Sequence, residues 1–159
     1  MITQKAIDFL KESNLIESVN DEDSLQQAIY AWNYLCEQKE LTLGVVLKLH
    51  KILMLHQPLM PDERGYFRTV PVYIGGHEAM QHEFIRENLT ILLEDMNYVP
   101  KDWKNHHIVY EAIHPFVDGN GRTGRMFMNW ERMKAGLKIK VIKYKDRWSY
   151  YEWFNPVGN

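Results

Sequence analysis

The chain has one short segment, residues 114–125, whose side chains are suited to handling a polyphosphate. It reads His-Pro-Phe-Val-Asp-Gly-Asn-Gly-Arg-Thr-Gly-Arg. Its glycines let the backbone approach an anion and present N–H groups to it. A helix that begins there adds the positive end of its dipole. Arg122 and Arg125 can grip phosphate oxygens through paired donors. Asp118 can bind Mg²⁺ together with phosphates, and His114 can accept a proton near neutral pH.

Four other interpretations fit parts of the same region. The glycines at 119, 121 and 124 match a dinucleotide-binding pattern, but an apolar helical stretch and a proline precede them, where that pattern needs a strand. His107, Glu111 and His114 share one helical face and could hold a metal, although the zinc-protease spacing is absent. Asp118 begins a sequence like a calcium loop, which lacks the closing glutamate. The Asn-Gly pair could also be a simple tight turn.

The segment resembles the signature of Fic-domain proteins, H-P-F-x-[D/E]-G-N-G-R-x-x-R, and matches it at every fixed position. The resemblance implies a protein adenylyltransferase, which transfers AMP from ATP to a Tyr, Ser or Thr hydroxyl of a target protein and releases pyrophosphate. It identifies His114 as the general base and Asp118 as the Mg²⁺ ligand. The nucleotide-binding residues that it implies are Phe116, Gly119, Asn120, Gly121, Arg122 and Arg125. Phe116 is interpreted as a core residue that anchors the loop.

The same resemblance leaves related activities open. The Doc branch phosphorylates its target and lacks the full G-N-G-R, which this chain has, so AMP transfer is favoured. Another branch transfers phosphocholine, and some relatives also remove AMP in the reverse reaction. A non-catalytic nucleotide-binding module is the alternative from a different class. The target is a protein with an acceptor hydroxyl, which could be this protein itself.

A second pattern near the N-terminus resembles the inhibitory helix of many Fic proteins, [S/T]-x-x-x-E-[G/N]. Ser13 and Glu17 match it, whereas Ser18 stands where Gly or Asn is usual. The resemblance implies that Glu17 pairs with Arg125 and suppresses ATP binding. Residues 1–20 are therefore predicted to be an inhibitory helix with its lead-in, and residues 21–159 the Fic catalytic domain, together forming one structural domain.

The elements that must position these residues are mostly helical. Apolar spacing predicts helices at about 3–17, 25–35, 42–53, 79–97, 101–113, 122–134 and 145–154. A β-rich segment, 65–76, predicts one hairpin. The fold class is thus mostly α, and the resemblance implies a compact helical bundle with a β-hairpin flap that holds a target segment as an added strand. The predicted flap residues are Tyr66, Arg68, Val70, Val72 and Ile74.

The composition bounds the class of protein. Of the 159 residues, 45% are hydrophobic and 13% aromatic, which is typical of a globular domain and excludes a disordered chain. The net charge of −2 gives no support for nucleic-acid or membrane binding. A single cysteine, Cys36, excludes an internal disulfide, and without a signal-peptide pattern the expected location is the cytoplasm. The sequence leaves the oligomeric state open.

Overall fold

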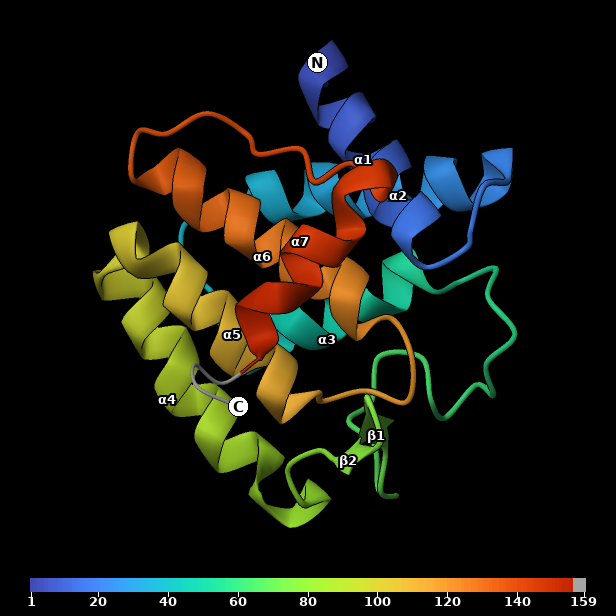
Figure 1. The fold of residues 1–159 in the computed structure, drawn as a ribbon, viewed down its shortest axis with the longest axis vertical. Helices are drawn as coiled ribbons and strands as arrows, with labels where there is room; N and C mark the ends of the chain where they lie inside the picture. The colour runs from blue at the N-terminus through green and yellow to red at the C-terminus, as the bar shows by residue number, and fades with distance from the viewer. Residues whose placement is uncertain (156–159) are drawn as a thin grey trace.

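The computed structural model describes residues 1–155 as a bundle of α-helices with one small hairpin (Figure 1). The predicted catalytic domain extends to residue 159, and its last four residues lie outside this range. The α-helices of the described part are α1 (Gln4–Ile16), α2 (Glu22–Cys36), α3 (Leu43–Leu53), α4 (Ile85–Tyr98), α5 (Trp103–Ile113), α6 (Asn120–Lys134) and α7 (Arg147–Tyr151). The mostly α fold class is therefore confirmed.

The first three helices begin where a side chain can cap them. The Thr3 hydroxyl accepts a hydrogen bond from the Ala6 N–H, and the Asp21 carboxylate accepts one from the Ser24 N–H at 2.8 Å. Thr42 caps α3 in the same way. Each of these bonds satisfies a backbone donor that has no partner within its helix, so these caps define where the helices start.

The core lies between the long helices. α5 and α6 pack together along the centre of the bundle, with α4 beside α5 and the α2–α3 pair against α6 (Figure 1). The main cluster is filled by large buried side chains such as Leu35, Leu49, Leu89 and Phe127. A second, smaller cluster joins the end of α1 to the C-terminal segment through Ile16, Met128, Ile142 and Tyr150. This second cluster brings both ends of the described chain against α6.

The predicted hairpin is much shorter than the sequence indicates. The paired strands are β1 (Tyr73–Ile74) and β2 (His77–Glu78), joined by two glycines with positive φ. Residues 65–71 form turns and extended chain, because the Gly65 N–H donates to His50 of α3 and the Arg68 N–H donates to the Pro115 carbonyl instead of to a partner strand. The prediction of one hairpin is therefore confirmed, but its extent, residues 65–76, was wrong.

Three helix boundaries also differ from the prediction. α4 begins at Ile85 instead of residue 79, after a 3-10 turn at His82–Phe84. α6 begins at Asn120 instead of Arg122, which brings the loop glycines to its first turn. The predicted helix 145–154 is a short α7 between two 3-10 turns. Among the described residues, each helix is too short or too polar to cross a lipid bilayer.

Candidate active site

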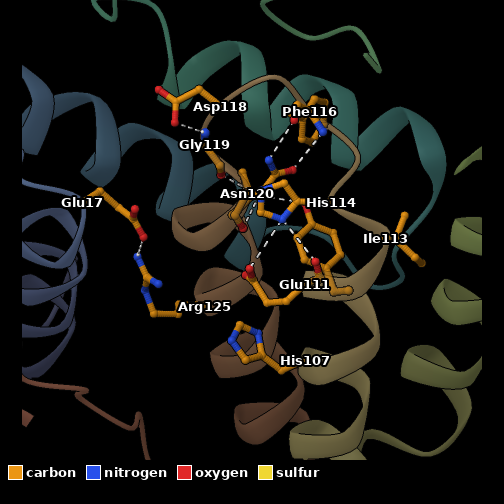
Figure 2. A network of polar contacts seen from close by, with 12 residues as sticks. Glu17, His107, Glu111, Ile113, His114, Phe116, Asp118, Gly119, Asn120 and Arg125 are labelled. Atoms are coloured by element: carbon orange, nitrogen blue, oxygen red, sulfur yellow. Dashed lines mark hydrogen bonds and ion pairs between the residues drawn. The ribbon is translucent and has the colours of Figure 1, made fainter. Parts of the chain in front are cut away.

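His114 lies at the end of α5, where the chain turns sharply toward α6 (Figure 2). Its φ of 51° and ψ of 64° are left-handed, a conformation that ends a helix. The ring Nδ1 is 3.1 Å from the Glu111 carbonyl oxygen, which fixes Nδ1 as the protonated nitrogen. Burial lowers the pKa of His114, so the imidazole is neutral at pH 7. Nε2 is therefore left as a proton acceptor.

The loop between the two helices is closed by Asn120. Its side-chain Oδ1 accepts from the Phe116 N–H and its Nδ2 donates to the Phe116 carbonyl, both at 2.8 Å. The sequence predicted that Asn120 contacts phosphate, but its buried amide is committed to the loop itself. Phe116 is fully buried, in agreement with its interpretation as a core anchor. Phe116 therefore supports the loop from behind, whereas Asn120 closes the loop and also lines the cavity described below.

His50 on α3 supports the same loop and was not identified from the sequence as a site residue. Its ring stacks on Phe116 with centroids 3.7 Å apart. Burial lowers the pKa of His50 to about 4, so the ring is neutral. Nδ1 accepts from the Gly65 N–H at 2.9 Å, and Nε2 then donates to the Asp118 carbonyl at 2.8 Å. A histidine within an apolar helical stripe was the only signal in the sequence.

The start of α6 and the end of α5 border a cavity of about 990 Å³. Gly119 has a φ of 89°, and a Cβ there would lie 2.8 Å from the Met54 sulfur, so the close approach requires glycine. The backbone N–H groups of a helix start point toward this cavity, which favours an anion. The predicted site residues that line it are His114, Asp118, Gly119, Asn120, Gly121, Arg125, Glu17 and Ile74.

The two arginines of the motif have different positions. Arg125 lines the cavity, whereas Arg122 is buried beneath the loop with its Nη2 3.9 Å from Asp118 Oδ2. Within the described chain, Nε and Nη1 of Arg122 have no hydrogen-bond partner. Arg122 thus does not line the cavity beside Arg125, and its contact with phosphate stays a prediction. The side chain of Arg122 instead supports the loop and Asp118.

Arg125 is held by the end of α1, as Figure 2 shows for Glu17. Its Nη2 is 2.7 Å from Glu17 Oε1 and 3.0 Å from the Ser13 carbonyl, and its Nε donates to the Ser13 hydroxyl at 2.8 Å. Burial opposes the charge of Arg125, but Tyr150 and Glu17 outweigh it, so the pKa of Arg125 is raised. The guanidinium is therefore charged at every pH at which the protein is folded.

Glu111 is a further carboxyl group in the cavity wall. Its Oε2 is 3.9 Å from His114 Nδ1, and its Oε1 has no partner among the described residues. Burial raises the pKa of Glu111 to about 7, so it is partly protonated at neutral pH. It lies beside Gly124, where a Cβ would come within 2.7 Å of Oε1. The sequence placed it on the same helical face as His114.

The flap is fixed by Arg68, whose side chain is buried. Its guanidinium donates to the carbonyls of Val70, Met80, Ile113 and His114, two of which end α5. Arg68 was predicted to bind the target, but this burial gives it a structural role instead. Tyr66 and Val70 are exposed, and Ile74 lines the cavity. The Val72 carbonyl accepts from the Ala79 N–H, which closes the hairpin.

The fold and the site together define a helical protein in which a glycine-rich helix start, a neutral histidine and a cationic side chain border one cavity. The chain belongs to the Fic/DOC family, whose family model matches residues 40–131. The Fic-family identification from the sequence is therefore confirmed.

Similar proteins support this classification. A protein adenylyltransferase Fic of Nematostella vectensis is 31% identical over 132 residues, which cover 77% of this chain and 30% of that protein. The protein of the same name from Drosophila virilis is 36% identical over 132 residues, which cover 74% of this chain and 25% of that protein. The chain thus spans less than a third of the length of these relatives.

Solved structures share the fold. A Fic domain containing signaling protein from Bacteroides thetaiotaomicron superposes with a TM-score of 0.79 at 18% identity, covering 92% of this chain and 69% of that one. Fic-1 from C. elegans gives a TM-score of 0.79 at 20% identity, covering 96% of this chain and 55% of that one. At these identities, the likeness establishes the Fic fold.

Proposed function

We propose that this protein transfers AMP from ATP to a Tyr, Ser or Thr hydroxyl of a target protein, and that the target includes copies of itself. The observation that carries this proposal is that one cavity is lined by His114, by the start of α6 and by Arg125. The relatives named protein adenylyltransferase Fic support the same reaction class. Transfer of another phosphate-containing group is the second candidate, and a non-catalytic nucleotide-binding module is the third.

The proposed step needs a base and an anion site. His114 Nε2 accepts the proton of the target hydroxyl, whose oxygen then bonds to the α-phosphorus of ATP. The bond from that phosphorus to the bridging oxygen breaks, and pyrophosphate leaves. The N–H group at Gly121, with Arg125, stabilises the negative charge that develops on the phosphates. A neutral His114 suits the role, since its Nδ1–H is already bound to a carbonyl.

The residues present fit a Mg²⁺ ion. The Asp118 side chain is 57% exposed and lies at the cavity edge, with Oδ1 accepting from the Gly119 N–H. A single protein carboxylate is sufficient, because Mg²⁺ commonly takes its other ligands from water and substrate phosphates. Bound to Asp118, Mg²⁺ would neutralise phosphate charge.

Glu17 is proposed to act as a brake on this activity. A carboxylate bound to Arg125 competes with phosphate for the same donors, and its own charge repels a polyphosphate. Breaking the pair makes the Arg125 guanidinium available to ATP. It also vacates the space beside Gly121, where Glu17 Oε1 now lies. Some relatives with this brake also catalyse removal of AMP, and the same site is proposed to support it.

The exposed side of the flap is proposed to hold the target. Tyr66, Val70 and Ile74 are exposed, and β1 and β2 form a ribbon of only two strands beside the cavity. A target segment could pair with this ribbon through its backbone, which would align a hydroxyl with His114 without reading much sequence.

Labelling with α-³²P-ATP and Mg²⁺ tests the proposal on the wild-type protein, Glu17→Gly and Glu17→Gly/His114→Ala. We expect strong self-labelling of Glu17→Gly, weak labelling of the wild type and none of the double variant. Equal labelling of the wild type and Glu17→Gly would refute the brake. Labelling from γ-³²P-ATP instead of α-³²P-ATP would favour phosphate transfer, and ATP binding without either label would favour the binding module.

A further inference from the structure

Arg125 is held by residues of two separate elements, the end of α1 and α7. Four hydrogen bonds bind its guanidinium, three to Ser13 and Glu17 of α1 and one to the Tyr150 hydroxyl of α7. In the proposed brake, ATP can bind productively only after Glu17 has left Arg125. The bond to Tyr150, with Nη1 and the hydroxyl 3.3 Å apart, is independent of Glu17.

The hydroxyl of Tyr150 has its hydrogen-bond roles fixed by its second partner. His107 Nε2 lies 2.7 Å from the Tyr150 oxygen. Burial lowers the pKa of His107 to about 3, so this histidine is neutral and its Nε2 can accept. In the tautomer of His107 that carries its proton on Nδ1, the hydroxyl donates its single hydrogen to Nε2 and uses an oxygen lone pair to accept from Arg125. His107 thereby aims the lone pair of Tyr150 at the guanidinium.

The ring of Tyr150 is firmly packed. It is 4% exposed and belongs to the small cluster that contains Ile16, Met128 and Ile142. Its ring centroid is 5.6 Å from the Cζ atom of Arg125, close enough for a cation–π contact. A buried aromatic side chain of this kind has few accessible rotamers, so it makes a rigid support.

We infer that Tyr150 is a positioning residue that keeps Arg125 aimed into the cavity after Glu17 has left it. This inference rests on the proposed function in one respect, namely that Arg125 binds ATP phosphate. With Glu17 removed, the bond to Tyr150 and the bonds to Ser13 orient the guanidinium, and only the Tyr150 bond comes from outside α1. The C-terminal segment therefore contributes to ATP binding through a residue outside the motif.

The test uses Tyr150→Phe in the Glu17→Gly background, which removes one oxygen and keeps the ring. The matched control is Tyr110→Phe, because the Tyr110 hydroxyl is also buried and also makes a 2.7 Å hydrogen bond, to Thr123. We expect calorimetry to show about tenfold weaker ATP binding for Tyr150→Phe and unchanged adenosine binding. The Tyr110→Phe control should bind ATP and adenosine as tightly as the Glu17→Gly parent does.

Two results would overturn the inference: unchanged ATP affinity, or equal losses for ATP and adenosine, which would assign Tyr150 to the nucleoside. A second measurement needs no nucleotide. The ¹⁵N order parameter of the Arg125 Nε should fall in Tyr150→Phe and stay constant in Tyr110→Phe. If the Glu17→Gly parent failed to bind ATP, the proposed function would be wrong, whereas an unchanged order parameter would independently refute the positioning role.

Discussion

Replacing Ser18 with glycine is expected to stabilise the protein and to tighten its brake. Ser18 follows the end of α1 with a φ of 60°, a left-handed conformation that side chains disfavour. Its N–H binds the Leu15 carbonyl and the next N–H, of Val19, binds the Asn14 carbonyl. This pair of bonds is a Schellman motif, in which the left-handed position is usually glycine. The Gly or Asn of the inhibitory pattern falls at this position.

The magnitude follows from two opposing terms. The left-handed conformation costs a residue other than glycine about 1–2 kcal/mol. Glycine loses about 0.5–1 kcal/mol more conformational entropy on folding. Ser18 is exposed, so little packing is lost on substitution. The net gain is about 0.5–1 kcal/mol, which corresponds to a rise in Tm of about 2 °C for a chain of this length.

The assay compares Ser18→Gly, Ser18→Asn and Ser18→Ala by urea unfolding. Alanine is the matched control, because it removes the hydroxyl but keeps the left-handed strain. We expect the free energy of unfolding to rank glycine first, asparagine second, and serine and alanine last. Since the turn also positions Glu17, we expect self-labelling to fall about two- to fivefold in Ser18→Gly. A glycine variant no more stable than the alanine variant would refute the reasoning.

Three further predictions concern the site and its supports. First, burial lowers the pKa of His114 below its usual 6.5. The kcat/KM of Glu17→Gly should therefore be level near pH 7 and fall only as the pH drops through that lowered pKa. An inflection above pH 7 would contradict this prediction. Second, Gly124→Ala should lose about 1–3 kcal/mol of stability in urea unfolding, because its Cβ would meet the rigid ring of Tyr110 at 2.9 Å. The control Gly44→Ala should not be destabilised, because the nearest neighbour of its Cβ lies 3.7 Å away. Third, Arg68→Met should speed amide exchange in residues 65–80, because it leaves four carbonyls without their donor; unchanged exchange would refute that role.

The helices could be predicted closely because their signals are local. Thr3, Asp21 and Thr42 stand where caps are needed, and the apolar positions repeat at helical spacing. The flap was predicted less well. Its glycines and β-branched residues resemble a hairpin, but hydrogen bonds from Arg68 to the end of α5 hold most of that segment away from any strand partner. Residues 113–115 are distant in sequence, so no local pattern reveals those bonds.

The sequence by itself determined the chemistry available to this protein. The twelve residues of the motif and the Ser13–Glu17 pattern are contiguous, so their types and spacing can be read directly. Only the tertiary structure decided how each side chain is used. It buries Arg122, presents Arg125 to the cavity, and adds the Ser13 carbonyl and the Tyr150 hydroxyl to the Glu17 partner of Arg125 that the resemblance implied. Such assignments depend on which helices pack together, and packing is settled by the burial of the whole core instead of by neighbouring residues.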